Sequence, residues 1–503
     1  MFKAYTFQFA MLNSMNKTRF LVIGILVMLV LAIFSAGCTQ NSPSSATTNT
    51  GAPESTAGSA NSADYTKGYE LGLEAYTYGL PLLETYTTFE TMTSVDVSNS
   101  VFGPVNQFNN ERSLNNPGST AVVATSPSSL SSIAWLDLSK EPQVLHVPEV
   151  TDHSFSLSLI DPYTNNLYNF GTVNQTPPGD YVIAGPGQYD LPIPAGTQRI
   201  DVDYSRIWII GSTQVKGSYD VANVTRIQDG YTLTPLSRYG TTYQPVNVTN
   251  PKTTVQQYQI PTGLAFYDML GQQLAQFPPP AADQSELSRL AEVGIGPGMT
   301  PSQNPQLSKD TIRGLEDAVA AGPAQIKNDT QAEYLKSFDG HNGYLLGGFG
   351  QYGTDYQLRA VITLIGLGAV SSEQTIYAAS WADHNKTPLN GSTDYVIHIA
   401  SAPPATAGWS LTAYDLNGTM IPNPINRYMI GNTMPLTQNA DGSVDIYLQS
   451  TQPSDTARVA NWLPTPGGQG FEVMWRFVGP KPAEIPGILD GTGWQPPVIT
   501  AVS

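Results

Sequence analysis

The sequence predicts an α+β, β-rich fold: two antiparallel β-sandwich or jelly-roll-like domains joined by a mostly helical segment, after an N-terminal anchor and a disordered stalk. Glycine (45) and proline (39) are abundant among the 503 residues, as expected for short strands joined by many turns. Short apolar or alternating runs dominate residues 101–238 and 395–478, whereas helical spacing dominates residues 263–382. The order of these regions gives the predicted architecture.

The first 38 residues are typical of a signal or lipoprotein-like anchor. Lys17 and Arg19 precede an uncharged run at residues 20–37, and Cys38 follows the small residues that end this run. Cys38 is the only cysteine, which excludes disulfides within the chain and multi-thiolate metal sites. We expect Cys38 to be lipidated; the alternative is an uncleaved signal anchor, because the run is long enough to span a bilayer. Both predict a protein at the cell membrane that faces outside the cytoplasm.

The rest of the chain divides into four predicted regions. Residues 39–65 are a flexible linker rich in Ser, Thr and Asn. An N-terminal β-rich domain follows at 66–245, then a helical connecting segment at 246–385 and a C-terminal β domain at 386–503. In an exported chain, Asn-x-Ser/Thr sequons are potential glycan acceptors. They lie at Asn174, Asn223, Asn247, Asn328, Asn385, Asn390 and Asn417.

The composition excludes some classes of partner. The formal net charge is −17 and charged residues make up only 13%, so no basic surface is expected for nucleic acid. The sequence contains no G-x-x-x-x-G-K-[ST], G-x-S-x-G or H-E-x-x-H motif, and its five histidines are widely spaced. We therefore expect no cofactor and assign no metal ligands, although a metal site assembled across the fold stays open. A small-molecule ligand and a homo-oligomer also stay open.

The elements follow in order. A helix is expected at 67–92, with Pro81 kinking or splitting it. Strands without intervening helices are expected next, at 121–123, 133–138, 143–147, 154–160, 181–184, 199–202 and 207–210. Helices are expected at 263–277, 307–321 and 329–337, and a second series of strands at 395–399, 409–414, 444–449 and 471–478.

A glycine motif lies between the two strand series. Gly348, Gly350 and Gly353 spell G-x-G-x-x-G, and a helical pattern follows. A dinucleotide-binding fingerprint also needs a preceding strand and a following parallel strand, but residues 371–374 suggest another helix start. We therefore interpret the glycines as a tight turn into a bridging helix. Asp355 lies where a carboxylate suits the helix dipole, one turn from Arg359.

Polar clusters in apolar context supply the candidate site. An arginine beside aromatic residues is expected to have a fixed carboxylate or carbonyl partner, because the chain has only 23 Lys and Arg. The candidate catalytic residues are Arg112, Asp161, Asp355, Arg359 and Arg427. The candidate binding residues are Gln107, Trp135, Tyr163, Tyr352, Asn426, Tyr428 and Trp462. The alternative for each cluster is a structural hydrogen-bond network.

These clusters lie in motifs that resemble the family pairing the domains of unknown function numbered 1254 and 1214. The motifs occur at residues 75–81, 106–108, 134–138, 159–161, 185–187, 228–236, 352–368, 409–415, 423–431, 439–443, 461–464 and 479–482. The resemblance covers nearly everything from residue 70 to residue 498. It implies β-rich domains, sandwich or jelly-roll-like, that flank a helical segment in proteins that are often exported. No activity is settled for the family, and hydrolytic roles have been suggested for members.

The chain departs from the family pattern at three polar positions. Asn110 stands where members usually carry a histidine, and residues 127–131 lack an expected acid and tyrosine. Gly211-Ser212 stands where members often have Gly-Arg. If those side chains form a reactive pocket in the family, this chain has lost much of it.

Two functions remain in competition. The first is a cell-envelope-anchored, externally facing protein that binds a small ligand or acts in an envelope assembly. The alternative is an exported hydrolase, with or without a metal, whose site lies between the two β domains and is built from the five charged candidates. In either case we expect the bridging helix to present Tyr352, Asp355 and Arg359 to the second β domain.

Overall fold

A computed structural model describes residues 62–119, 124–244, 251–339, 344–345 and 347–502. The predicted anchor with Cys38, nearly all of the predicted linker and the predicted strand at 121–123 lie outside the described residues. No helix among the described residues is long and apolar enough to cross a membrane.

The chain folds as two compact units. One contains Pro81–Ile260 and the chain from Ala332 onward, and it holds every sheet that the described residues form. The other contains Pro261–Gln331 and the described residues up to Leu80. The predicted domain boundaries at 245/246 and 385/386 stay predictions.

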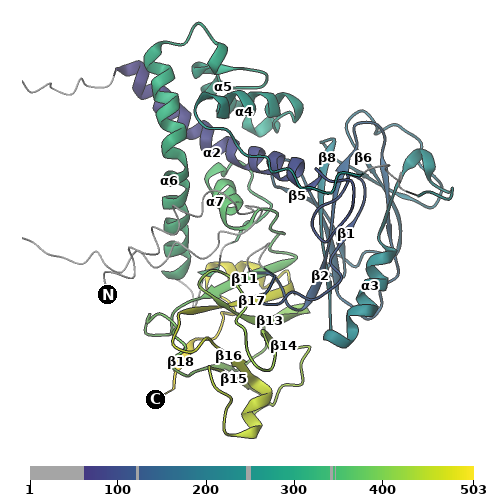
Figure 1. Cartoon of the computed structure of the whole chain (residues 1–503), viewed down its shortest axis with the longest axis vertical. Helices are drawn as coiled ribbons and strands as arrows, with labels where there is room; N and C mark the ends of the chain where they lie inside the picture. Colours follow the sequence, from purple (N-terminus) through teal and green to yellow (C-terminus); the bar gives the residue numbers. More distant parts are fainter. Residues whose placement is uncertain (1–61, 120–123, 245–250, 340–343, 346, 503) are drawn as a thin grey trace, which may run out of the picture. The chain divides into compact units, whose positions relative to one another are not determined.

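The N-terminal β region consists of two sheets, as predicted (Figure 1). Sheet A is antiparallel in the order β1-β2-β8-β4-β5, and sheet B has the order β7-β6-β3-β9 with only β6 and β7 parallel. Phe170 of sheet A meets Tyr181 of sheet B with 4.8 Å between ring centroids, so the two sheets share a core. The strands are β1 (Asn109–Asn110), β2 (Ser129–Asp137), β3 (Gln143–Val147), β4 (Phe155–Ile160), β5 (Asn166–Gly171), β6 (Gly179–Ala184), β7 (Gln198–Asp201), β8 (Arg206–Gln214) and β9 (Thr232–Pro235).

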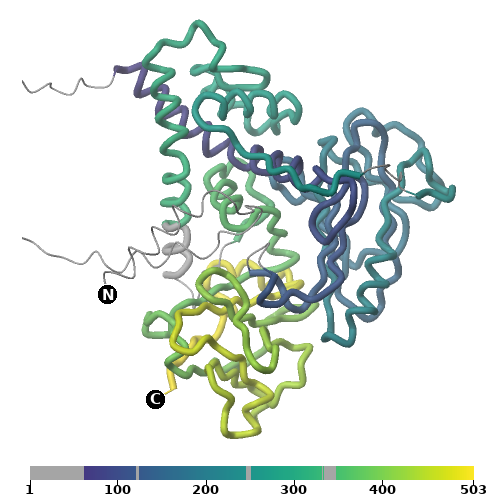
Figure 2. The backbone as a smooth tube through the Cα atoms, viewed as in Figure 1, coloured from purple at the N-terminus to yellow at the C-terminus, as the bar shows by residue number. Residues whose placement is uncertain are grey.

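The C-terminal β region repeats this plan, and the chain ends in it (Figure 2). Sheet C is antiparallel in the order β10-β11-β17-β13-β14, and sheet D has the order β16-β15-β12-β18 with only β15 and β16 parallel. Leu411 and Trp475 of sheet C pack in one buried cluster with Ile446 of sheet D. The strands are β10 (Tyr344–Leu345), β11 (Thr375–Ser380), β12 (Tyr395–Ile399), β13 (Ala405–Asp415), β14 (Met429–Gly431), β15 (Val444–Gln449), β16 (Trp462–Pro464), β17 (Phe471–Pro480) and β18 (Ile499–Ala501).

Helices lie mainly between the two β regions in sequence, which confirms the predicted fold class. Two details of this element order differ from the prediction. The strands of the first region are interrupted by α3, and the predicted helices at 307–321 and 329–337 form one helix, α6, that contains Pro323. The helices are α2 (Ala63–Met92), α3 (Val221–Gly230), α4 (Leu264–Gln276), α5 (Gln284–Leu290), α6 (Lys309–Asp339), α7 (Tyr356–Gly366) and α8 (Ile485–Asp490).

Helix α2 was predicted to kink or split at Pro81, and it does not split, because it runs as one element of 30 residues. A proline removes one helical N–H bond and does not remove the apolar contacts around it. Leu80, Leu82 and Leu83 are buried on either side of Pro81. The hydroxyl of Thr85 also donates to the carbonyl of Pro81 at 2.8 Å. Packing therefore keeps the helix continuous.

The glycine loop before α7 has the predicted turn geometry. Gly348, Gly350 and Gly353 have φ of 77°, 67° and 55°, the left-handed region that favours glycine. A Cβ on Gly350 would lie 2.9 Å from Nδ2 of Asn166. The turn interpretation is therefore confirmed.

The predicted helix start at residues 371–374 was wrong. Those residues form a turn, with the N–H of Gln374 bonded to the carbonyl of Ser371 at 2.8 Å, and strand β11 follows. β11 runs antiparallel to both β10 and β17. A strand does follow α7, but it pairs antiparallel with its neighbours, whereas a dinucleotide-binding fold has a parallel strand at this point.

Candidate functional site

One face of sheet A changes from aromatic to hydroxyl side chains along its strands. At one end, Trp135 of β2 stacks on its register partner Trp208 of β8, with 4.6 Å between ring centroids. At the other end, Ser212 of β8 is the register partner of Ser156 of β4. Side chains alternate along a strand, so Ser212 shares the face of Trp208, four residues earlier. Hydroxyl groups thus continue an aromatic surface.

A second polar row crosses sheet C. Arg476 of β17 is the register partner of Tyr377 on β11 and of Ser410 on β13. The opposite face of these strands packs into the core shared with sheet D, where Leu411 and Trp475 are buried. Tyr377, Arg476 and Ser410 therefore stand on the face of sheet C that does not contribute to that core.

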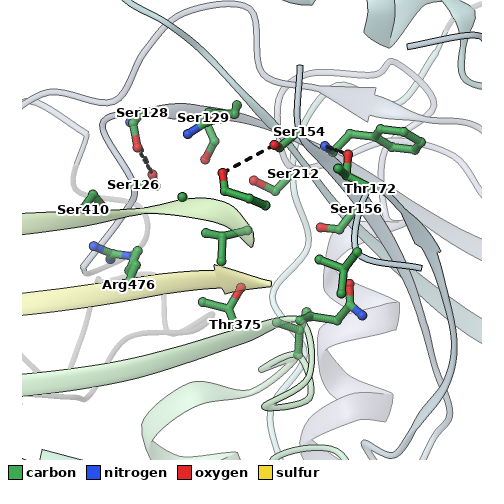
Figure 3. Close-up of a pocket in the computed structure, with 18 of the residues that line it drawn as sticks. Ser126, Ser128, Ser129, Ser154, Ser156, Thr172, Ser212, Thr375, Ser410 and Arg476 are labelled. Atoms are coloured by element: carbon green, nitrogen blue, oxygen red, sulfur yellow. Dashed lines mark hydrogen bonds between the residues drawn. The ribbon is translucent and has the colours of Figure 1, made fainter. Parts of the chain in front are cut away.

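A cavity of about 210 Å³ is lined by these two faces, and both sheets belong to the same compact unit. Figure 3 shows Ser154, Ser156 and Ser212 from sheet A and its entry loop on one side, with Ser410 and Arg476 from sheet C on the other. Apolar side chains such as Ile210 and Val478 complete the wall. The cavity is therefore a mixed surface of small hydroxyls and apolar groups.

The hydroxyls differ in how far they are already bonded. Ser126 and Ser128 bond each other at 3.2 Å, and the hydroxyl of Thr172 accepts from the N–H of Phe155 at 3.1 Å (Figure 3). The side chains of Ser156 and Ser212 bond no other described residue. A serine hydroxyl can both donate and accept, so these two groups can bond either a donor or an acceptor of a bound molecule.

Arg476 is the one cation on the described part of the cavity wall, and its guanidinium is already engaged. It donates to the carbonyl of Ala124 at 2.6 Å, to the hydroxyl of Tyr414 at 2.9 Å and to that of Thr412 at 3.2 Å. No Asp, Glu, His, Lys or Cys is found among the described lining residues. Burial raises the pKa of the Tyr377 hydroxyl, so this phenol is protonated at neutral pH. The described part of the wall therefore supplies no carboxylate, imidazole or amine as a general base.

A separate polar cluster joins the turn after β4 to the glycine loop and α7. Asp161 accepts from the N–H groups of Tyr163 and Asn165, each at 2.8 Å, and from Nδ2 of Asn165 at 2.9 Å. Burial raises the pKa of Asp161 to about 6, against the opposing effects of these hydrogen bonds and of the Arg359 charge. Asp161, Tyr163 and Arg359 thus lie together, as a candidate site would require.

Arg359 is 1% exposed and donates to the carbonyl of Gly353 at 2.8 Å. Its Nε and Nη1 atoms have no hydrogen-bond partner among the described residues, and its guanidinium lies 5.8 Å from the ring centre of Tyr163. Burial raises the pKa of Tyr352, which is also influenced by the charges of Arg359 and Asp161. We expected the bridging helix to present these side chains to the second β domain. Arg359 instead faces the turn between β4 and β5 in the first β region, where Asp161 and Tyr163 lie. The N–H of Asn166, which follows that turn, donates to the carbonyl of Gly350 at 2.8 Å and so holds the turn against the glycine loop.

The other charged candidates lie elsewhere. Arg112 pairs with Asp229 at 2.6 Å on the surface. Arg427 donates to the carbonyls of Val459 at 2.7 Å and Trp462 at 2.9 Å. Asp355 caps α7 by accepting from the N–H of Leu358 at 2.9 Å, and it forms no ion pair with Arg359. The five charges therefore do not meet in one site, which argues against a hydrolytic centre built from them.

The remaining binding candidates have structural contacts. Trp135 donates to the sulfur of Met92 at 3.5 Å, and Trp462 donates to the carbonyl of Gln449 at 2.8 Å. The Tyr428 hydroxyl donates to Asn426 at 3.0 Å, and Gln107 is half-buried. None of the candidates named from the sequence lines the cavity.

The residues that do line the cavity had two signals in the sequence. Ser154 and Ser156 are small polar residues alternating with apolar ones before Ile160, which is typical of a strand with one polar face. Ser128, Ser129 and Ser212 are positions where the chain departs from the family pattern, and all three line the cavity. Arg476 and Ser410 gave no local signal, because their positions opposite sheet A depend on long-range packing.

Two family models match the chain. Residues 105–235 match Protein of unknown function (DUF1254), and residues 374–482 match Protein of unknown function (DUF1214). The chain pairs these two matches in that order. The DUF1254 match contains the sheet A wall of the cavity, and the DUF1214 match contains most of the sheet C wall. A search of curated proteins finds no significant match.

One of two similar solved structures shows the same fold. The VPA0106 protein from Vibrio parahaemolyticus has a TM-score of 0.65 and 21% identity, and the match covers 87% of this chain and 100% of that one. A putative uncharacterized protein from Burkholderia cenocepacia has a TM-score of 0.39 and 13% identity, covering 87% of this chain and 94% of that one. The first likeness shows the fold alone, and both family matches are to domains of unknown function.

Proposed function

We propose that this protein binds a small, uncharged, amphipathic molecule in the cavity between sheets A and C. The observation that carries the proposal is the chemistry of the wall: unbonded serine hydroxyls beside apolar side chains, with a single cation whose donors are engaged. Small-ligand sites are usually apolar concave surfaces with a few polar groups that fix orientation. A guest with one or two hydroxyl or carbonyl groups on an apolar body fits this surface.

Charged guests are disfavoured by the same wall. An anion would need donors, and the guanidinium of Arg476 already donates to Ala124, Thr412 and Tyr414. A cation would need a carboxylate, and none lies among the described lining residues. Moving a charge from water into such a site without a partner costs several kcal/mol.

The test is binding of 2-naphthol, which carries one hydroxyl on an apolar ring, compared with naphthalene-2-sulfonate, its anionic counterpart. Probe fluorescence and calorimetry on the purified full chain measure both. We expect the neutral probe to bind at least about tenfold more tightly than the anion. Equal binding of the two, or binding of the anion alone, contradicts the proposal.

Two variants locate the binding. Ser156→Leu places an isobutyl group in the cavity and should abolish 2-naphthol binding, and Ser212→Leu does the same from a more exposed position. Ser285→Leu, the same change at an exposed position of α5, is the matched control and should bind normally. Thermal unfolding checks that each variant is folded. Unchanged binding in a folded Ser156→Leu variant would place the probe elsewhere.

We also propose that the chain is exported and held at the outer face of a membrane through Cys38. The support is the basic residues, the uncharged run at 20–37 and the single cysteine that ends it. Metabolic labelling with radioactive palmitate should label the natural chain, and Cys38→Ser should lose the label. Label retained in that variant would mean that the lipid is absent from Cys38.

A further inference from the structure

A second hollow follows the edge of the N-terminal sandwich. Sheet A ends at β5 and sheet B ends at β7, so this side of the sandwich is not closed by hydrogen bonds between strands. The hollow has a volume of about 350 Å³ and is lined by β5, by Tyr181 of β6 and by Gln198 of β7. It shares no lining residue with the cavity between sheets A and C.

Amide side chains dominate this hollow. Asn166, Asn169, Asn174, Gln198 and Gln351 all line it. Each amide presents an acceptor and two donors, so the wall can bond groups that both donate and accept.

Two of these amides have unsatisfied atoms. Nδ2 of Asn166 and Oδ1 of Asn169 are buried and have no hydrogen-bond partner among the described residues. Oδ1 of Asn166 accepts from the N–H of Ser371 at 3.4 Å, which fixes the orientation of that amide. One unpaired donor and one unpaired acceptor thus lie beneath the surface of the hollow on the same strand, and leaving them unpaired is costly.

An aromatic ring lies beside the amides. Tyr168 lines the hollow and is 37% exposed, and Phe170 supports its ring with 4.6 Å between centroids. The hydroxyl of Tyr181 is occupied, because it donates to the carbonyl of Pro177 at 2.6 Å. Tyr168 therefore offers an apolar ring surface next to polar donors and acceptors.

The charge of the hollow restricts the guest. Glu373 is the one carboxylate among the described lining residues, and no Lys, Arg or His is found among them. Phosphate, sulfate and carboxylate groups would meet no cation there. No described group of three or more His, Cys, Asp or Glu residues could hold a metal ion that might bridge such an anion.

We propose that this hollow binds a neutral saccharide. A sugar ring has hydroxyls that both donate and accept around its rim, which matches the amides, and a C–H face that can lie on Tyr168. The volume suits one or two sugar units. An extended peptide added to the edge of β5 is the competing occupant, but it would leave the amide-rich wall without a specific role.

The experiment titrates cellobiose, maltose and N,N′-diacetylchitobiose into the purified full chain, followed by saturation-transfer NMR and calorimetry. We expect at least one of these neutral disaccharides to bind. Tyr168→Ala should weaken its binding about tenfold by removing the ring surface. Asn169→Leu, which replaces one amide of the wall by an apolar side chain of similar volume, should weaken it by a similar factor.

Tyr219→Ala is the matched control, because Tyr219 is 81% exposed and does not line the hollow. No binding of any of the three sugars at about 10 mM would overturn the proposal. Equal affinities of the Tyr168→Ala and Tyr219→Ala variants would also overturn it. Binding of acetyl-tetraserine amide without sugar binding would show peptide addition to β5 instead. The Ser156→Leu variant should keep sugar binding, so this outcome is independent of the 2-naphthol test.

Discussion

Two buried carboxyl groups, Asp161 in the first β region and Glu472 in the second, make an instructive pair. Each is 3% exposed, and each feels the charge of a neighbouring arginine, Arg359 or Arg476. Burial raises the pKa of Asp161 to about 6 and that of Glu472 to about 8. The two pKa values differ by more than the similar burial and the neighbouring arginines would suggest.

The difference between the two pKa values is explained by the hydrogen bonds that each carboxyl group accepts. Asp161 accepts three, two from backbone N–H groups and one from Asn165, and all of them favour the charged form. Oε1 of Glu472 has no partner among the described residues, and the nearby Asp415 charge raises its pKa further. A neighbouring arginine therefore does not keep a buried carboxyl ionised unless hydrogen bonds also do so.

The largest expected effect comes from removing the acid in the second region. The pKa of Glu472 is raised above its ordinary value of 4.5, so the folded protein holds this proton more tightly than the unfolded chain. Its contribution to stability is therefore present below about pH 4.5 and is lost as pH rises toward 8. Glu472→Gln keeps the shape without the titration and should raise the free energy of unfolding at pH 8 by about 4 kcal/mol.

Urea unfolding at pH 5 and pH 8 measures this effect. Glu484→Gln, the same change at an exposed residue, is the control and should leave the pH dependence unchanged. A Glu472→Gln protein that is less stable than the natural chain at pH 8 would mean that the ionised carboxylate is stabilised in the fold. The contrast with Asp161 would then fail.

Asp161 was named as a candidate from the sequence and Glu472 was not, and the difference has a physical reason. Asp161 precedes a proline in a turn between strands, where an aspartate commonly bonds the backbone N–H groups that follow it. Glu472 lies in a strand that alternation can recognise, but alternation cannot show that both faces of sheet C are covered there. The burial of Glu472 depends on partners more than 50 residues away in sequence, such as its register partner Tyr414.

The same limit explains what could be predicted of the fold and the candidate sites. Strands such as β3, β12 and β15 were predicted with their observed bounds, because periodicity is local. Strand β5, which reads Asn-Leu-Tyr-Asn-Phe-Gly, was missed because an edge strand with amide side chains lacks the apolar alternation. The cavity was missed as a whole, since sheets A and C contribute its walls from distant parts of the chain.

A smaller effect should follow when a hydrogen bond is removed from the first region. Asn165→Ala deletes the Nδ2 donor to Asp161 and should raise the pKa of that carboxyl further, so that it resembles Glu472 more closely. The loss of stability should be about 1 to 2 kcal/mol at pH 8 and less at pH 5, where Asp161 is largely protonated. Urea unfolding at both values measures it.

Asn439→Ala is the matched control for that variant. It removes an amide donor to Asp445 at 3.1 Å, where the bond is exposed to solvent. Its cost should be smaller and should not grow between pH 5 and pH 8. If Asn165→Ala costs the same at both pH values, hydrogen bonding by Asn165 does not hold down the pKa of Asp161.

The smallest effect is expected where an acid and an arginine meet in water. Arg112 and Asp229 lie 2.6 Å apart, with side chains 45% and 58% exposed. Solvent screens such a pair, so Arg112→Ala should cost between about 0.2 and 1 kcal/mol, and less at high salt. A double-mutant cycle with Asp229→Ala isolates the pair from the bond that Arg112 also donates to the carbonyl of Thr225 at 3.1 Å. We expect this exposed pair to be coupled more weakly than a buried pair. A coupling energy above about 2 kcal/mol would contradict that expectation, since the exposed pair would then be as strongly coupled as a desolvated one.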